Sequence, residues 1–327
     1  MDTPELTHSL AAPHSISGWA TTRWDIGAIR SAELIRSYVN DVYRINTDLG
    51  SFALKIFRRS WRSRSDAIWE SQLCAHLDDA GIRLALPNPG VDGHQVQTII
   101  YPEGERAALL TPWLGVAKPK PPWTEKLYFD FGRAAARMHQ ASSTFTPESP
   151  GRLLNTDYLI RRPVEKLCTQ LNNRPKTFER LLDVSGSVAS HLDVLTADLA
   201  FGVCQGDLSF DNLSILQDGE FAFYDFDLGG HGWFAFDFAF FHGWTRKDDS
   251  AVAFWDAFRA GYGEIREITA AEIEAMPLFD VAYMIWNLEH TINKWTQWSG
   301  TWQATDAKVD DMLTTIFELA DSGIPSS

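Results

Sequence analysis

Residues 204–237 read CQGDLSFDNLSILQDGEFAFYDFDLGGHGWFAFD, and this stretch decides how the rest of the chain is interpreted. Asp207, Asn212 and Asp225 stand out in it by their spacing. After Asn212, two short apolar runs flank an Asp-Gly dipeptide, which is a strong signal for a β-hairpin. A hairpin would bring Asn212 and Asp225 to the same end.

These residue types suit the chemistry of phosphoryl transfer, in which catalysis depends mainly on positioning and on cations. Asp207 would face an acceptor hydroxyl and take or orient its proton. Asn212 and Asp225 would offer the oxygen ligands that Mg²⁺ prefers, and Asp227 would be a second carboxylate ligand if the strand continued. The alternative is that these residues are only turn formers around a hairpin, and the stretch alone leaves both interpretations open.

The composition is that of an ordinary globular chain, with 327 residues, 45% hydrophobic and 22% charged. The net charge of −14 argues against nucleic acid or a membrane surface as a partner. The three cysteines are far apart and form no CxxC pair, which favours a reducing compartment over a zinc site. Residues 1–20 lack a signal-peptide pattern and no apolar run is long enough to span a membrane, so we expect a cytoplasmic protein.

The first part of the chain predicts a small antiparallel sheet with one helix. Residues 1–30 form a lead-in segment, of which 1–20 are expected to be loosely ordered or peripheral. Residues 31–112 form an N-lobe, with predicted strands at 33–36, 42–45, 52–57, 94–101 and 106–110 and a helix at 65–80.

Lys55 lies inside the third predicted strand, with apolar neighbours on both sides. It is either an edge residue that reaches water or a cation aimed at an anion. Glu70 lies beside the apolar stripe of the helix, which is expected to be capped by Ser65 or Asp66. A Lys55–Glu70 ion pair is one interpretation, and a Glu70 on the solvated helix face is the other.

Residues 113–327 form a larger, mostly helical C-lobe after a proline-rich connector, so that the predicted fold class is α+β. A proline at position 277 should break or bend the first turns of one of its helices. Helices are predicted at 124–141, twice within 150–200, at 249–262, from 269 towards 295, and at 309–319.

Taken in order, these features resemble the bilobal protein-kinase-like fold, and within it the aminoglycoside phosphotransferase and choline kinase superfamily, over about residues 30–320. SYVNDVYR at 37–44 is similar to the phosphate loop of the branch that holds bacterial stress response kinase A. FGRAAARMH at 131–139 resembles the Gly-Arg-x-x-Ala-x-x-His helix of the superfamily, and DFA at 237–239 its Asp-Leu-Ala element.

The resemblance implies ATP and Mg²⁺ as cofactors and a role for each matching residue. Asp207 would be the catalytic base, Asp237 would brace its loop, and Lys55, held by Glu70, would contact the α- and β-phosphates. The other implied contacts are Tyr38 and Asn40 in the phosphate loop, the backbone of Thr111, Trp113 and Leu114 at the adenine, and Asn212 and Asp225 at the metal.

Two positions depart from the superfamily pattern, because Gln205 and Ser209 stand where histidine or a similar residue is usual. A glutamine side chain both donates and accepts hydrogen bonds, so it can brace the loop differently. The sequence therefore predicts a phosphotransferase that moves the γ-phosphate to the hydroxyl of a small molecule or of a protein Ser/Thr. The alternative is a pseudokinase-like module that binds a nucleotide with little catalysis.

Overall fold

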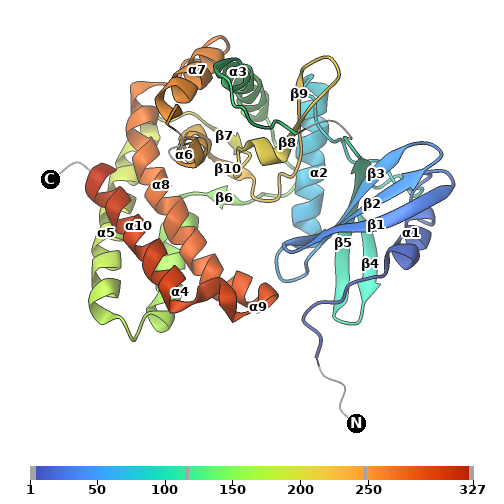
Figure 1. Ribbon diagram of the computed structural model, residues 1–327, viewed down its shortest axis with the longest axis horizontal. Coiled ribbons are helices and arrows are strands. Elements are labelled where there is room, and N and C mark those ends of the chain that lie inside the picture. Colours follow the sequence, from blue (N-terminus) through green and yellow to red (C-terminus); the bar gives the residue numbers. More distant parts are fainter. Residues whose placement is uncertain (1–4, 115–117, 246–248, 324–327) are drawn as a thin grey trace. The chain divides into compact units, whose positions relative to one another are not determined.

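The computed structural model describes residues 5–114, 118–245 and 249–323, which form two compact units (Figure 1). Unit 1 consists of Met1–Lys120, Phe145–Gly151 and Phe210–Asp225. Unit 2 consists of Pro121–Thr144, Arg152–Ser209 and Phe226–Ser327. The stretch 204–237 therefore contributes to both units, because its central part belongs to the unit that holds the N-terminal sheet.

Unit 1 contains a five-stranded antiparallel sheet in the order β1-β2-β3-β5-β4. Its strands are β1 (Ile29–Ser37), β2 (Asn40–Thr47), β3 (Ser51–Phe57), β4 (Gln97–Tyr101) and β5 (Gly104–Pro112). All the strands predicted for this region are confirmed. Most are longer than predicted, since backbone pairing continues through polar residues that carry no apolar signal.

Helix α1 (Pro13–Thr21) is part of the core of unit 1. Ile16 and Ala20 lie four positions apart on one helix face, and at most 1% of either is exposed. They belong to the same hydrophobic cluster as Tyr43 and Leu54 of the sheet. The expectation of a loosely ordered or peripheral segment over residues 1–20 is therefore wrong for this helix, because a short apolar stripe in a polar segment gives little periodicity.

Helix α2 (Arg64–Asp79) begins at a capping box rather than at the predicted caps Ser65 or Asp66. Ser63 is the N-cap, and its side chain accepts a hydrogen bond from the Asp66 N–H. The Asp66 carboxylate accepts one from the Ser63 N–H in return. This reciprocal pair satisfies two backbone donors at the helix start and fixes the helix that carries Glu70.

Unit 2 is mostly helical. Its α-helices are α3 (Glu125–Ser142), α4 (Arg162–Gln170), α5 (Pro175–Leu195), α6 (Phe234–Thr245), α7 (Ala251–Gly263), α8 (Ala270–His290), α9 (Thr296–Ser299) and α10 (Asp306–Gly323). Short π-helical or 3₁₀ segments lie at Asp157–Arg161, Thr196–Asp198, Thr291–Trp295 and Thr301–Ala304. The predicted helices are confirmed, and α6 was not predicted from the sequence.

Two details of these helices follow from packing. Helix α8 continues unbroken through Pro277, so the predicted break is wrong; the many buried residues along α8 hold the helix where propensity alone would interrupt it. Helices α3 and α7 approach closely at two glycines. A Cβ on Gly132 would lie 2.0 Å from the Phe258 carbonyl oxygen, and one on Gly261 would lie 1.8 Å from the Phe129 carbonyl oxygen.

Five short strands lie within residues 204–237 or pair with strands there. The predicted hairpin forms in unit 1 from β8 (Leu213–Ile215) and β9 (Phe221–Phe223). In unit 2, β10 (Gly230–Trp233) pairs with β6 (Leu153–Leu154) and with β7 (Phe201–Cys204), a sheet that the sequence did not predict. Because β7 ends at Cys204 and β10 leads into α6, this sheet places the Asp207 loop next to the start of α6.

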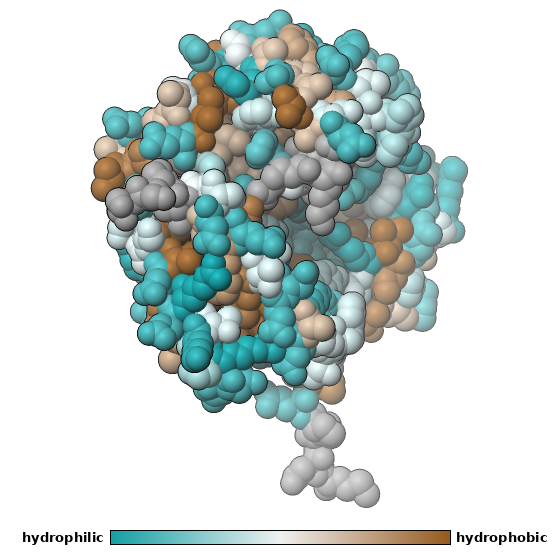
Figure 2. Space-filling view, turned by 60° about the vertical axis from the view of Figure 1, so that its left-hand side comes forward, coloured by the Kyte–Doolittle hydropathy of each residue, from teal (hydrophilic) through white to brown (hydrophobic). Residues whose placement is uncertain are grey.

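No helix in the part of the chain that the structure describes is long and apolar enough to cross a membrane. Figure 2 shows hydrophilic side chains over most of the visible face, with apolar side chains gathered in small groups. The chain is an α+β protein with an antiparallel N-terminal sheet and a larger, mostly helical remainder.

Candidate active site

Lys55 is the centre of a charged cluster in unit 1. It lies on β3 between Leu54 and Ile56, whose side chains point to the opposite face of the sheet and are fully buried. Its Nζ lies 2.6 Å from Glu70 Oε1 and 3.3 Å from Asp225 Oδ1. The Lys55 side chain is 15% exposed and that of Glu70 is 9% exposed. The predicted ion pair is therefore confirmed, and the alternative of a solvated Glu70 is wrong.

The hairpin brings the two predicted metal ligands of unit 1 to the same end. The Tyr224 N–H donates to the Asn212 carbonyl oxygen at 3.1 Å, directly before Asp225. Asp225 has a φ of 61°, in the left-handed region that Asp and Asn adopt more readily than most residues. Because β9 ends at Phe223, the strand does not continue to Asp227, and the argument from strand alternation for that residue is wrong. Its role as a ligand stays a prediction.

Arg36, at the end of β1, joins this cluster and was missed in the sequence analysis. Its Nη2 lies 3.4 Å from Asp225 Oδ2, whereas Lys55 faces the other carboxylate oxygen. Each oxygen of Asp225 therefore faces a cation. A basic residue immediately before the predicted phosphate loop is the signal that could have found it.

The predicted phosphate loop is the turn between β1 and β2. The Tyr38 N–H donates to the Asn40 carbonyl oxygen at 3.2 Å, and Arg58 Nε donates to the Tyr38 carbonyl oxygen at 3.0 Å. Asn40 is 1% exposed. Burial raises the pKa of the Tyr38 phenol, which keeps it a neutral hydroxyl. Residues 37–41 contain no glycine, and both a backbone bond and the Arg58 side chain hold this turn.

The predicted adenine-binding segment follows β5. Thr111 pairs with Ala53 in the sheet. The Trp113 N–H donates to the Ser51 carbonyl oxygen at 2.8 Å, so this donor is already used within unit 1. The Ser214 hydroxyl donates to the Leu114 carbonyl oxygen at 3.5 Å. A base bound here would use the remaining backbone groups of the segment.

In unit 2, Asp237 holds the loop that carries Asp207. Asp237 lies in the first turn of α6 and is fully buried. Its Oδ2 accepts the Gln205 N–H at 2.7 Å, and its Oδ1 accepts the Gly206 N–H at 2.9 Å. His139 Nε2 lies 3.0 Å from Oδ2 of the same carboxylate. These contacts match the bracing that the resemblance implies for Asp237.

Gln205, the departure from the superfamily pattern, has a structural partner. It is 1% exposed, and its Oε1 accepts the Asp207 N–H at 2.7 Å. Ser209 Oγ donates to Asp207 Oδ1 at 3.4 Å. Gly206 has a φ of 80°, and a Cβ there would lie 2.3 Å from the Leu228 carbonyl oxygen. The loop is thus held by a glutamine side chain and by a glycine that no other residue replaces without strain.

Tyr283 of α8 lies near Asp207 and was also missed. Burial raises the pKa of the Tyr283 phenol, and the negative charge of Asp207 adds to the rise. Its ring stacks on Trp286, with 6.1 Å between the ring centroids. The sequence signal is the spacing of three, which puts both aromatic residues on one helix face.

Asp227 belongs to unit 2, unlike Asp225. It is 6% exposed. Arg152 Nη1 donates to the carbonyl oxygens of Asp227 and Gly229 at 3.2 and 2.9 Å. Arg152 therefore holds the segment after the hairpin, and Arg152 is not part of any predicted motif.

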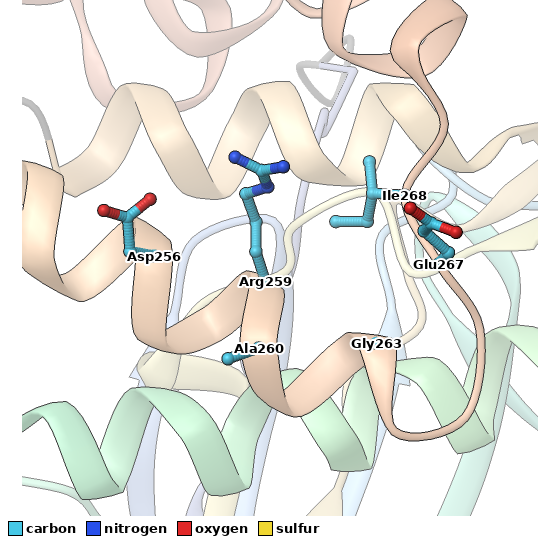
Figure 3. A pocket seen from close by; sticks show the side chains of 6 residues that line it. All are labelled: Asp256, Arg259, Ala260, Gly263, Glu267 and Ile268. Carbon is cyan, nitrogen blue, oxygen red and sulfur yellow. The ribbon is translucent and has the colours of Figure 1, made fainter.

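A pocket of about 290 Å³ lies in unit 2 between α7 and the segment that follows it. Figure 3 shows the Arg259 side chain rising from α7 between Asp256, on the same helix, and Ile268 and Glu267 of the next segment. None of the predicted site residues lines this pocket.

A family model described as "Phosphotransferase enzyme family" matches residues 31–272, which is more than half of the chain. The chain belongs to this family. The match includes all the site residues predicted from the sequence, from Tyr38 to Asp227. The predicted superfamily is thus confirmed, and so is the predicted class of enzyme, a kinase that acts on an alcohol group.

Individual relatives agree with the family assignment. An uncharacterized protein of Deinococcus radiodurans is 30% identical over 286 residues, which cover 85% of this chain and 82% of that protein. A homoserine kinase of Rhizobium meliloti is 27% identical over 263 residues, covering 78% and 76%. The solved structure of amicoumacin kinase hAmiN in complex with AMP-PNP, Ca²⁺ and Ami matches with a TM-score of 0.75 at 19% identity, covering 96% and 95%. This likeness confirms the protein-kinase-like fold.

The donor set suits magnesium better than a transition metal. Among the residues that the structure describes, no group of three or more His, Cys, Asp or Glu could hold a metal ion. If Asn212 and Asp225 hold a metal as predicted, they would supply one amide and one carboxylate oxygen, both hard ligands. Mg²⁺ in phosphotransferases is commonly bound by few protein ligands and completes its octahedron with phosphate oxygens and water.

Proposed function

We propose that this phosphotransferase moves the γ-phosphate of ATP, with Mg²⁺, to a hydroxyl acceptor. The observation that carries the proposal is the cluster in which Lys55 lies 2.6 Å from Glu70 and 3.3 Å from Asp225. The Glu70 pair fixes the direction of a largely buried ammonium group. A lysine fixed in this way beside a carboxylate that could bind a metal suits the binding of a nucleoside triphosphate and its metal ion.

The nucleotide would bind mainly to residues 31–112, which we propose as the nucleotide-binding lobe. Lys55 would contact the α- and β-phosphates, and Tyr38 and Asn40 would contribute from the phosphate loop. The backbone of Thr111, Trp113 and Leu114 would face the adenine. Asn212 and Asp225, with Asp227 as a further candidate, would hold Mg²⁺, which neutralises charge on the phosphate oxygens.

Asp207 is proposed as the catalytic base in residues 113–327, the proposed C-lobe. It would accept the proton of the acceptor hydroxyl while that oxygen forms a bond to the γ-phosphorus. The bond from the γ-phosphorus to the β,γ-bridging oxygen breaks, and ADP leaves. Gln205 and Asp237 bind backbone N–H groups of this loop, which would limit the reorganisation that the Asp207 carboxylate needs before the proton moves.

The acceptor is proposed to be a hydroxyl-bearing small molecule, or else a Ser/Thr hydroxyl of a protein. The homoserine kinase of Rhizobium meliloti, at 27% identity, supports the small-molecule class. Tyr283 and Trp286 would present a neutral hydroxyl and an aromatic face beside the Asp207 loop.

We further propose a cytoplasmic location without nucleic-acid or membrane partners. Cys74, Cys168 and Cys204 are all free thiols, which fits a reducing compartment. The net charge of −14 disfavours polyanionic partners.

The test is Mg²⁺-dependent release of ADP from ATP over a panel of homoserine, other small amino alcohols, aminoglycosides and an unfolded Ser/Thr-rich protein. Asp207→Asn should lower kcat by about 10²–10⁴-fold, the usual contribution of a general base, while AMP-PNP still binds. Asp198→Asn, at an exposed position outside the loop, is the matched control and should behave as wild type.

Two results would contradict the proposal. AMP-PNP binding without ADP release for any acceptor would favour the alternative of a nucleotide-binding module with little catalysis. No AMP-PNP binding with Mg²⁺, or binding that survives Asp225→Ala unchanged, would exclude the proposed nucleotide site.

A further inference from the structure

The segment before α1 is hydrogen-bonded to the sheet of unit 1 at three points. The Ser9 N–H donates to Glu103 Oε1 at 2.8 Å, and Arg106 Nη1 donates to the Ser9 carbonyl oxygen at 3.0 Å. Tyr43 Oη donates to the Ala11 carbonyl oxygen at 2.7 Å. These bonds hold Ser9 and Ala11 against β2, β5 and the turn that precedes β5.

His8 in this segment contacts a buried carboxylate, that of Asp41. His8 Nε2 lies 3.1 Å from Asp41 Oδ1, which also accepts the Ser37 hydroxyl at 2.6 Å. Arg106 Nη2 donates to Asp41 Oδ2 at 2.7 Å. The Asp41 and Arg106 side chains are 0% exposed, and that of His8 is 15% exposed.

These contacts keep Asp41 ionised. Burial alone would raise the pKa of the Asp41 carboxyl, but hydrogen bonds from His8 and Ser37 and the charge of Arg106 lower it instead. A buried carboxylate that lost one of these partners would seek another, because an unsatisfied buried charge is costly. The position of Asp41 thus depends on the N-terminal segment as well as on the sheet.

Asp41 also closes the phosphate loop. Ser37 and Asp41 are opposite each other in the β1–β2 register, and their side-chain hydrogen bond joins the two ends of the turn. This bond, the Arg58 contact to the Tyr38 carbonyl oxygen and the backbone bond from the Tyr38 N–H to the Asn40 carbonyl oxygen all hold the turn. His8 contacts the same carboxylate oxygen as Ser37, so it is linked to the turn through a single atom.

We propose that residues 5–12 form an N-terminal clamp that positions the phosphate loop for the nucleotide, with His8 as a positioning residue that acts through Asp41. The proposal rests on the proposed function, because it assumes that residues 37–41 meet the phosphates. A loop held in its binding conformation loses less conformational freedom when the ligand binds. The clamp therefore contributes to nucleotide affinity and leaves proton transfer at Asp207 unchanged.

A merely structural role would give a different result. Arg106 also donates to the carbonyl oxygens of Phe57 and Ile56, so the sheet keeps its own buried hydrogen bonds when His8 is removed. Loss of His8 should then disturb the turn rather than the fold of unit 1.

The experiment compares His8→Ala with wild type in the full chain. It measures the KM for ATP and kcat by steady-state kinetics, the Kd of AMP-PNP with Mg²⁺ by calorimetry, and the Tm. His8→Ala should raise both the KM and the Kd by about fivefold, as expected for one hydrogen bond, with kcat unchanged. His8→Gln should restore both values, because its amide N–H₂ can replace the Nε2 donor. His14→Ala, at an exposed position in α1, is the matched control.

An unchanged Kd in His8→Ala, with or without a lower Tm, would overturn the clamp and leave the proposed function intact. An equal loss in His8→Gln and His8→Ala would also overturn it, since the hydrogen bond would then not be the cause. Absence of AMP-PNP binding by the wild type would overturn the proposed function and the clamp with it.

Discussion

The two units hold their candidate functional groups in different ways. In unit 1, the side chain of Lys55 forms direct ion pairs with those of Glu70 and Asp225, and the Asp225 side chain is 24% exposed. In unit 2, the fully buried Asp237 binds the backbone of the loop that carries Asp207, and Ser209 Oγ contacts Asp207 Oδ1 at 3.4 Å. Side-chain pairs near water can exchange partners, whereas backbone N–H groups bound to a buried carboxylate cannot do so without opening the loop.

This difference fits the two tasks of a phosphotransferase. The groups that bind a nucleotide and its metal must accept new charges and release old ones in every cycle. A catalytic base must instead keep one position relative to the acceptor. Substitutions in the unit 1 cluster should therefore change nucleotide affinity, whereas substitutions behind the Asp207 loop should change kcat and stability together.

Among the substitutions that compare how the two units hold their functional groups, the largest effect is expected for Lys55→Ala. Loss of a fixed cation at the phosphates should lower kcat/KM for ATP by about 10²–10³-fold, similar to the loss of one preorganised charge-stabilising donor. Steady-state kinetics at varied ATP would measure it, and Glu70→Gln should give a smaller loss because its side chain still accepts a hydrogen bond.

Lys126→Ala is the control for Lys55, since that side chain is 83% exposed on α3. A large loss of stability in Lys55→Ala with an unchanged KM for ATP would contradict the distinction between the units, because the cluster would then be structural.

A smaller effect, on both stability and kcat, is expected for Asp237→Asn. An amide has one acceptor oxygen where the carboxylate has two, so one of the N–H groups of Gln205 and Gly206 loses its partner in a buried site. This should cost about 1–3 kcal/mol of unfolding free energy and lower kcat, with little change in the Kd of AMP-PNP. Denaturant unfolding and kinetics on the same samples would test both parts.

The control for Asp237 is Asp311→Asn, at an exposed position on α10. If Asp237→Asn weakened AMP-PNP binding as strongly as it lowered kcat, the two units would not divide the work as proposed.

The sequence predicted the parts of the site that depend on local pattern. Lys55 in a β-strand and Glu70 on the following helix come from residues that are close in sequence, and the Asp-Gly turn predicts the hairpin that aligns Asn212 with Asp225. Contacts between distant residues were not predictable in this way. Arg36 and Asp225 are separated by 189 positions, and no periodicity or turn signal links them.

Short elements with a weak sequence pattern were not predicted, for a related reason. The strands β6 and β7 have two and four residues, too few for a period of two to show. Helix α1 lies in a polar segment, and its packing against the sheet depends on the tertiary fold. The strand argument for Asp227 failed differently, because strand alternation was extended past Asp225, a residue with a left-handed backbone, and the ligand role of Asp227 itself stays a prediction.

The smallest effect is expected for Arg36→Ala, and it tests whether the exposed side of the unit 1 cluster takes part in nucleotide binding. The Arg36 side chain is 54% exposed and 3.4 Å from Asp225, so its contribution should stay below about 1 kcal/mol. We expect the KM for ATP to rise about threefold and the effect to shrink as salt is added, since a solvent-exposed cation near the phosphates is screened. Arg30→Ala, at an exposed position on the same strand, is the matched control. Equal changes in both variants would show that only the total positive charge of β1 affects nucleotide binding. A change confined to Arg36→Ala would indicate that Arg36 leaves Asp225 and contacts the nucleotide when it binds.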